Sequence, residues 1–510
     1  MPKAPAGETV AVIDIGSNSG RVVVYRLHRD GYLRILATSR ASLRLVRELD
    51  ADHSLSPQAE ARALDALQDF RALALGSGAR RTVALATAAV RDAANGLAFI
   101  RRVRKQLGIQ VRILSGDEEA QYGFLGAVRG LPVADGVLFD LGGGSMQVSR
   151  FKARRLVKDW SFPLGALRLS DAFLHSDPPA GREMRRLQEH VRRTLESAGI
   201  GRLGRGQSLV GTGGTVRNLA NVDQRSVSYP IPRLHGYVLS RERLAAIAAL
   251  LAATRQRKRQ GVPGLNDDRT DSIAGGALAI ETLVEVLDAP EIHISGQGVR
   301  EGMAYSLMSR NLPSTEASRE SSVLALATSF SEWDPHAARR RADLVRALLK
   351  ALEPDAEEEL REALIHGARL LDIGRSIDYF ERHAHVADIV LATDLVGFSH
   401  RSVALLSAVV RSAGDGDFAA TTYAPLLTRH DRDPVERAGV ILALADDIGE
   451  RCRRGRPIPL RCRVGRREVR IAVSALEGWR PRRIAERFES AFGRSLHVAP
   501  GRTKGPRPRP

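Results

Sequence analysis

The sequence predicts an α/β protein with a duplicated core, followed by a mainly helical C-terminal part with a small sheet. Three observations lead to this fold class. Apolar strand-like segments alternate with helical segments over about the first 310 residues. A glycine turn preceded by an aspartate recurs about 125 residues after its first appearance. From about residue 316 the pattern is helical, with no convincing strand pair before residue 449.

The first predicted element is a β-hairpin. Residues 10–15 and 21–27 are mostly apolar, and the turn Gly16-Ser17-Asn18-Ser19-Gly20 joins them. A helix is predicted over 56–75, because Ser56 suits the N-cap and Pro57 the first helical position. The next predicted elements are a strand at 82–87, a helix at about 94–107, a strand at 110–114 and a helix from Asp117.

The opening motif then returns. Asp140 precedes the turn Gly142-Gly143-Gly144-Ser145 as Asp14 precedes Gly16 and Ser17. A third glycine turn, containing Gly213, Gly214 and Thr215, follows a strand at 208–210, and a fourth lies at 295–298. Turns of this kind expose backbone N–H groups and form anion cradles. Four of them in one chain predict a phosphate-binding cleft.

The aspartates and hydroxyls of these turns suit phosphate chemistry. Asp14 and Asp140 each end a predicted strand, where open α/β sheets place their ligands. A carboxylate at that position can hold Mg²⁺ together with substrate phosphates. The additional polar donors are Ser17, Asn18, Ser19 and Ser145.

Composition limits the partners. The net charge of +18 favours polyanions, and the aromatic content of 5% argues against a base-stacking surface. Neither cysteine, Cys452 or Cys462, has metal-site spacing, and free thiols fit a reducing cytoplasm. Neither a signal peptide nor a bilayer-spanning segment is recognised, so we expect a soluble cytoplasmic protein.

A small sheet is predicted within 453–473, and residues 501–510 are predicted to form a disordered basic tail.

Seven strings follow one another over about the first 310 residues: VAVIDIGSNSGRVVVYRL, ATAAVRDAANG, ILSGDEEAQYGFLG, LFDLGGGSMQVSRF, PLGALRLSDAF, GTGGTVRNLA and ISGQGVREGMAY. In content and order they resemble the exopolyphosphatase/guanosine pentaphosphate phosphohydrolase (Ppx/GppA) family. The resemblance implies two ribonuclease-H-like domains of the actin/Hsp70/sugar-kinase superfamily, with the active site between them. It suggests domains at 1–133 and 134–310, a helical HD-like domain with a small β part at 311–500, and the tail at 501–510.

The resemblance also implies roles for single residues. In the family, the carboxylate at the position of Glu119 activates the attacking water, and Arg91 would neutralise charge on the transferred phosphoryl group. Two departures stand out. Gln147 replaces the glutamate that ends the family's second glycine motif, and Gly296 replaces a common aspartate in the fourth turn. Metal binding would then depend on Asp14 and Asp140.

The C-terminal part resembles an HD-like domain more loosely. Residues 367–374 match the LHDIG pattern except that Leu371 stands in place of the histidine. A metal-dependent HD active site is therefore not expected.

The leading functional hypothesis is an exopolyphosphatase, a processive hydrolase that removes terminal phosphate from inorganic polyphosphate. Guanosine pentaphosphate hydrolysis uses the same chemistry and stays open as the main alternative. A kinase of the same superfamily and a catalytically weak polyanion-binding protein are the remaining hypotheses. The implied cofactor is Mg²⁺ or Mn²⁺, with a monovalent cation such as K⁺ as a further candidate. A homodimer is expected, with no membrane and no specific nucleic-acid partner.

Overall fold

The computed structural model describes residues 7–28, 31–45, 53–309, 312–414, 418, 420–453, 458–473, 476, 479 and 481–500. The chain forms two compact units: Met1–Ser228 with Arg233–Ser321, and Tyr229–Pro232 with Ser322–Pro510. The first unit contains two α/β sheets, and the second is mainly helical with a small sheet. This confirms the predicted fold class. The predicted basic tail, 501–510, lies outside the described residues.

The first sheet has the strand order β3-β2-β1-β4-β5. Strands β1 (Thr9–Ile15) and β2 (Ser19–Leu27) form the predicted antiparallel hairpin, and β3 (Leu33–Ser42) continues it. Strand β4 (Arg81–Ala86) is parallel to β1, and β5 (Val111–Ile113) is parallel to β4. The turn after β1 therefore lies at the carboxyl edge of the parallel strands, where α/β sheets bind ligands.

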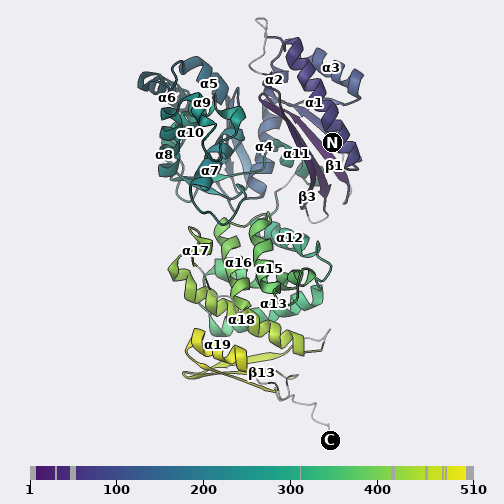
Figure 1. Ribbon diagram of the computed structural model, residues 1–510, viewed down its shortest axis with the longest axis vertical. Coiled ribbons are helices and arrows are strands. Elements are labelled where there is room, and N and C mark those ends of the chain that lie inside the picture. The colour runs from purple at the N-terminus through teal and green to yellow at the C-terminus, as the bar shows by residue number, and fades with distance from the viewer. Residues whose placement is uncertain are drawn as a thin grey trace. The chain divides into compact units, whose positions relative to one another are not determined.

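Helices cover both faces of this sheet. The side chains of β1 point alternately to the two faces, and they are mostly apolar on both, so each face needs a covering layer. Ile13 packs in one core with α1 (Pro57–Gly76) and α3 (Gly96–Leu107), whereas Val12 packs in another with α11 (Val299–Met308). Figure 1 shows α1 and α3 together beside β1. Helix α1 begins as predicted, since the Ser56 side chain accepts a hydrogen bond from the backbone N–H of Ala59.

The second sheet has the strand order β10-β11-β9-β6-β7-β8. Its strands are β6 (Gly136–Leu141), β7 (Met146–Lys152), β8 (Arg155–Phe162), β9 (Ser208–Thr212), β10 (Val238–Ser240) and β11 (Glu291–Ile294). The helices around it are α5 (Ala166–Phe173), α6 (Gly181–Ser197), α7 (Gly214–Ser226), α8 (Arg241–Ala253), α9 (Gln256–Arg259) and α10 (Ile273–Leu287). Strands β6 and β7 repeat the β1–β2 hairpin, which explains the repeated aspartate–glycine motif.

Two helices join the two halves of the first unit. Helix α4 (Gly116–Arg129) follows the first sheet but contacts strands of the second, whereas α11 follows the second sheet and contacts β1 and β2. The two helices touch because Gly126 and Gly302 lack side chains: a Cβ on Gly302 would overlap the carbonyl oxygen of Tyr122. This close contact places the first turn of α4 and the first turn of α11 at the same cleft.

The second unit is built mainly from helices, as predicted for 316–449. Helix α12 (Thr315–Ala327) crosses the boundary between the units at Ser321. The following helices are α13 (Pro335–Leu352), α14 (Glu358–Leu370), α15 (Arg382–Ala392), α16 (His400–Ala413), α17 (Ala420–Tyr423) and α18 (Arg432–Arg451), with short 3-10 turns η3 (Leu371–Ser376) and η4 (Arg429–Asp431). The predicted small sheet contains β12 (Leu460–Val464) and β13 (Glu468–Val473). Its third strand, β14 (Ser495–Pro500), pairs parallel with β13 after α19 (Arg482–Phe492), and neither was predicted.

Candidate active site

A cavity of about 340 Å³ lies at the carboxyl edges of the two sheets in the first unit. Residues from all four predicted glycine turns line it, and those of the first three are Gly16, Ser17, Asn18, Ser19, Gly142, Gly143, Gly144, Ser145, Thr212, Gly213 and Gly214. From the fourth turn, Gly298 lines the same cavity. The structure therefore brings the predicted phosphate-binding turns together in one cleft.

Thr215 is the exception among these predicted phosphate ligands. Thr215 is 1% exposed and is not among the residues that line the cleft. It lies against α10 instead, close enough to Gly276 that a Cβ there would overlap the Thr215 methyl group. The glycine turn thus reaches the cleft through Gly213 and Gly214, and Thr215 begins the buried face of α7.

The first two turns have the same backbone geometry. The backbone N–H of Gly16 donates to Ser19 O at 3.2 Å, and that of Gly142 donates to Ser145 O at 3.0 Å. The aspartates also match, since Asp14 lies opposite Arg21 and Asp140 lies opposite Gln147 in their hairpins. The two turns therefore repeat one backbone conformation in the two halves of the first unit, as expected for a duplicated fold.

Three carboxylates line the cleft: Asp14, Asp140 and Glu119. Burial raises the pKa of Asp14 and of Asp140, although Arg300 and Arg217 respectively oppose that shift. Burial also raises the pKa of Glu119 to about 7, against the lowering effect of Arg91. Glu119 is thus poised to exchange a proton near neutral pH, which a general base requires.

The geometry of α4 fixes the position of Glu119. The Ser115 side chain caps the helix by accepting a hydrogen bond from the backbone N–H of Glu118. The Glu118 carboxylate in turn accepts one from the backbone N–H of Ser115. Glu119 follows in the first turn, with its side chain 14% exposed. Arg91, at the end of α2 (Ala88–Arg91), donates from Nη1 to Glu119 Oε2 at 3.1 Å and to Leu114 O at 2.9 Å. The two predicted catalytic residues are therefore direct neighbours, although Arg91 itself does not line the cleft.

The sequence interpretation missed the basic groups of the cleft, which are Arg21, Arg40, Arg217, Arg269 and Arg300. Arg300 donates to Asp14 Oδ2 at 3.2 Å, and Arg217 donates to Gly296 O at 3.2 Å. Burial lowers the pKa of Arg217 to about 10, so it stays charged at neutral pH. These arginines come from distant segments. Arg21, Arg217 and Arg300 lie one or two residues after a recognised glycine turn, whereas Arg40 and Arg269 do not.

The cleft also fits a divalent cation. Asp14 and Asp140 both line it, and Gln147 lines it directly opposite Asp140 in the β6–β7 ladder. Among the described residues no group of three His, Cys, Asp or Glu side chains is placed to hold a metal by itself. Mg²⁺ commonly uses only one or two protein carboxylates and completes its shell with water and substrate phosphates. Asp14 and Asp140 suit such an open site.

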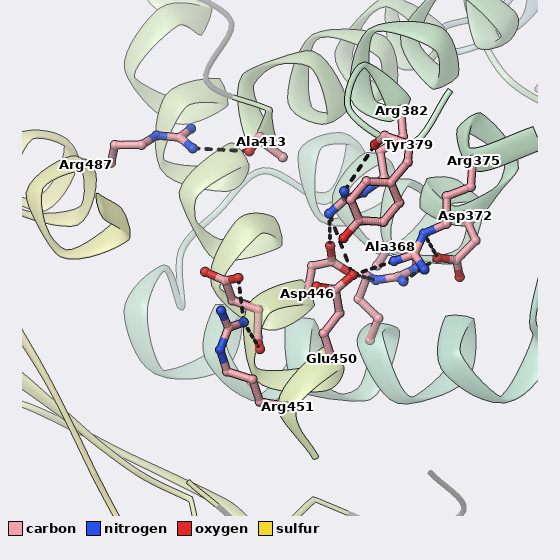
Figure 2. Close-up of polar contacts among 12 residues, drawn as sticks. Ala368, Asp372, Arg375, Tyr379, Arg382, Ala413, Asp446, Glu450, Arg451 and Arg487 are labelled. Carbon is pink, nitrogen blue, oxygen red and sulfur yellow. Dashed lines mark hydrogen bonds and ion pairs between the residues drawn. The ribbon is translucent and has the colours of Figure 1, made fainter. Parts of the chain in front are cut away.

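In the second unit, the aspartate of the LHDIG-like segment, Asp372, forms ion pairs with arginine side chains. Arg341 on α13 is 4% exposed and donates to Asp446 Oδ1 at 2.6 Å and to Asp372 Oδ1 at 2.9 Å. Figure 2 shows Asp372 and Asp446 turned toward the surrounding guanidinium groups. Arg382 donates to the second carboxylate oxygen of Asp446, Oδ2, at 2.9 Å. Asp372, the aspartate of the LHDIG-like segment, is thus held in an ion-pair network of protein side chains.

Comparison with known proteins identifies the family of the chain. The Ppx/GppA phosphatase family matches residues 23–311, and domain III of the Ppx/GppA phosphatases matches residues 318–486. The chain belongs to the Ppx/GppA phosphatase family. It is therefore an enzyme of the hydrolase class, and the second unit corresponds to the additional domain of longer Ppx/GppA members.

Two relatives in this family are exopolyphosphatases. Exopolyphosphatase 1 of Mycobacterium tuberculosis is 29% identical over 318 residues, which cover 62% of this chain and 92% of that protein. Exopolyphosphatase 2 of the same organism is 30% identical over 313 residues, covering 58% of this chain and 98% of that protein. The crystal structure of the Aquifex aeolicus Ppx/GppA family member has a TM-score of 0.52 and 26% identity, and the match covers 59% of this chain and 97% of that one.

The described part of the chain has no helix with the length and apolar character needed to cross a membrane.

Proposed function

We propose that this Ppx/GppA phosphatase is an exopolyphosphatase that removes terminal orthophosphate from inorganic polyphosphate. The composition of the cleft carries the proposal. Five arginines and the glycine turns line it, and the described lining residues include no aromatic side chain that could stack on a guanine base. The exopolyphosphatases of M. tuberculosis support the same substrate class.

The residues of the cleft divide the reaction between them. The backbone N–H groups of the glycine turns and the five arginines bind the oxygens of the chain end and spread its negative charge. Water attacks the terminal phosphorus in line, and its oxygen forms a new P–O bond while the bond to the bridging oxygen breaks. Glu119 accepts a proton from the water, and the bridging oxygen stays on the shortened chain. Arg91 orients the Glu119 carboxylate.

A divalent cation completes this proposal. Mg²⁺ or Mn²⁺ would be held by Asp14 and Asp140 and, when bound, would supply charge neutralisation at the phosphate oxygens. Gln147 would contribute an amide oxygen at most. The cytoplasmic location and the homodimer stay predictions from the sequence.

The proposal is tested by substrate comparison. Purified full-length protein with Mg²⁺ is given long-chain polyphosphate or guanosine pentaphosphate, and orthophosphate release is followed to obtain kcat/KM for each. We expect polyphosphate to be preferred, because the described lining of the cleft binds phosphate groups and offers no surface for a base. Preference for guanosine pentaphosphate would assign the second activity of the family instead.

The rate should depend on pH through Glu119. Since burial raises its pKa to about 7, the base form is lost as pH falls below 7. We expect kcat/KM with polyphosphate to fall about tenfold per pH unit on the acid side of an apparent pKa of about 7, and to level off above it. A profile that is flat down to about pH 5.5 would remove Glu119 as the titrating base.

Replacing Gln147 by the glutamate of the family's motif should strengthen metal binding. In Gln147→Glu a second anionic ligand would face Asp140 across the hairpin, and ligand charge is a main determinant of divalent-cation affinity. Calorimetric titration of the substrate-free protein with Mn²⁺ should give a Kd lowered about tenfold. The control is Gln121→Glu, which adds the same charge on exposed α4 surface outside the cleft. Equal Kd values for the two variants would contradict a metal site at Asp140.

A further inference from the structure

A second cavity of about 270 Å³ adjoins the cleft. Four residues line both cavities: Ser17, Ala88, Gly144 and Ser145. Two of the glycine turns therefore form a shared wall, with the large cleft on one side and the small cavity on the other. The small cavity is also lined by Ser161, Phe162 and Pro163 at the end of β8 and by residues of α2 and α5.

Two arginines, Arg91 and Arg168, and one carboxylate, Asp92, line the small cavity, which leaves it a net positive charge. Arg91 reaches it from the end of α2, where its Nε pairs with the neighbouring carboxylate of Asp92 at 3.3 Å. Arg168 reaches it from the first turn of α5 and is exposed. Within the described part of the chain, the Arg168 side chain makes no hydrogen bond or ion pair, so its guanidinium is free to bind an anion. The hydroxyls of Ser17, Ser145 and Ser161 add donors of suitable type.

The backbone holds Arg168 against the phosphate cradle. The N–H groups of Leu167 and Arg168 both donate to Gly143 O, at 3.0 and 3.2 Å. Gly165 makes this contact possible, since a Cβ at that position would overlap the backbone of Gly143 and Gly144. The position of Arg168 is therefore fixed relative to the turn that would bind the substrate.

The catalytic pair marks the boundary between the two cavities. Glu119 lines the large cleft and Arg91 lines the small cavity, and the two side chains are hydrogen-bonded at 3.1 Å. A phosphoryl group attacked beside Glu119 would thus be released next to Arg91. The large cleft, with its five arginines, suits the anionic chain, whereas the small cavity, with two arginines against Asp92, has a small net positive charge that suits one phosphate group.

We propose that the small cavity is a subsite for a single orthophosphate, through which the product leaves while the shortened chain stays in the cleft. This inference rests on the proposed exopolyphosphatase function. Separate exits for the monomer and the polymer would allow repeated cleavage without release of the chain.

Arg168→Ala tests this subsite. Orthophosphate binding to the full-length protein is measured by calorimetry without substrate, and the inhibition constant of orthophosphate is measured during polyphosphate hydrolysis. We expect both the Kd and the inhibition constant to rise about tenfold, as expected for the loss of one charge-assisted hydrogen bond. Arg155→Ala is the matched control, because Arg155 on β8 is exposed and lines neither cavity.

The outcomes separate the subsite from the proposed function. If the protein releases no phosphate from polyphosphate but Arg168→Ala still weakens orthophosphate binding, the subsite stands and the function is wrong. If the wild type hydrolyses polyphosphate but orthophosphate binding and inhibition are unchanged in Arg168→Ala, the subsite is refuted. A raised KM for polyphosphate with an unchanged inhibition constant would also refute it, because Arg168 would then bind the polymer.

Discussion

Replacing Glu119 by glutamine should lower kcat for polyphosphate hydrolysis by about 10²- to 10⁴-fold, the range expected for loss of a general base. The glutamine side chain would keep the size of the original and an acceptor for Arg91, but it cannot accept a proton from the attacking water. The measurement is steady-state orthophosphate release with Mg²⁺ at a saturating polyphosphate concentration. A variant that retains more than about a tenth of the wild-type kcat would contradict the role assigned to Glu119.

Glu118→Gln is the matched control for this variant. Glu118 is the preceding residue in the same helical turn, but its carboxylate pairs with Arg112 and caps Ser115, outside the cleft. Glutamine can keep the capping box, so we expect kcat within about threefold of the wild type. Thermal melting of the wild type and Glu119→Gln at about pH 8 tests whether unfolding of the variant explains its loss of kcat. Because burial raises the pKa of Glu119 to about 7, its ionised form costs folding free energy at that pH, and the neutral Glu119→Gln variant should be no less stable.

The second large effect is expected in the helical unit. Arg341→Met should lower the free energy of unfolding of this unit by about 3–5 kcal/mol, because it leaves Asp372 and Asp446 buried without their shared cation. Burial alone would raise the pKa of Asp446, but Arg341 and Arg382 together hold it below its usual value. Removing Arg341 therefore removes a main reason for that carboxylate to stay ionised inside the fold.

Differential scanning calorimetry of the full chain measures this effect as a lowered transition of the helical unit. Arg346→Met is the control, because Arg346 lies on the same helix and pairs with Asp343 at the surface, where such a pair contributes about 0–1 kcal/mol. A double replacement of Asp372 and Asp446 by leucine in the Arg341→Met background should recover part of this stability, since the leucines need no counter-ion and Arg375 and Arg382 keep Glu450 as a partner. Equal effects of the Arg341 and Arg346 variants would contradict a buried network.

The elements that could be predicted from the sequence are those whose signals are local. The hairpin at Asp14 and its repeat at Asp140 are recognisable because a glycine turn interrupts two apolar strands, and the structure gives both turns the same hydrogen bond. Helix α1 was predictable because its N-cap, Ser56, and its first residue, Pro57, are also a local signal. The strand β14 was not predicted because it pairs parallel with β13 across an intervening helix, so its partner is not its neighbour in sequence.

The same distinction applies to the site. The glycine turns could be predicted from the residues themselves and Glu119 from the resemblance to the Ppx/GppA family, and the structure places them in one cleft. Arg21, Arg217 and Arg300 each follow a glycine turn within two residues. Arg40 and Arg269 carry no local signal, since an arginine is most often a solvated surface residue. Their function depends on convergence from distant segments. The Arg341 network arises in the same way, from a helix far from Asp446 in sequence.

The most direct test of the account is the isotopic composition of the product. The protein is incubated with long-chain polyphosphate and Mg²⁺ in ¹⁸O-enriched water, and the orthophosphate formed is analysed by mass spectrometry. Water attack driven by Glu119 at the chain end predicts orthophosphate as the product, with one oxygen from water in each molecule released from the end of a chain. Release of unlabelled orthophosphate, or no release at all, would contradict hydrolysis of polyphosphate in this cleft.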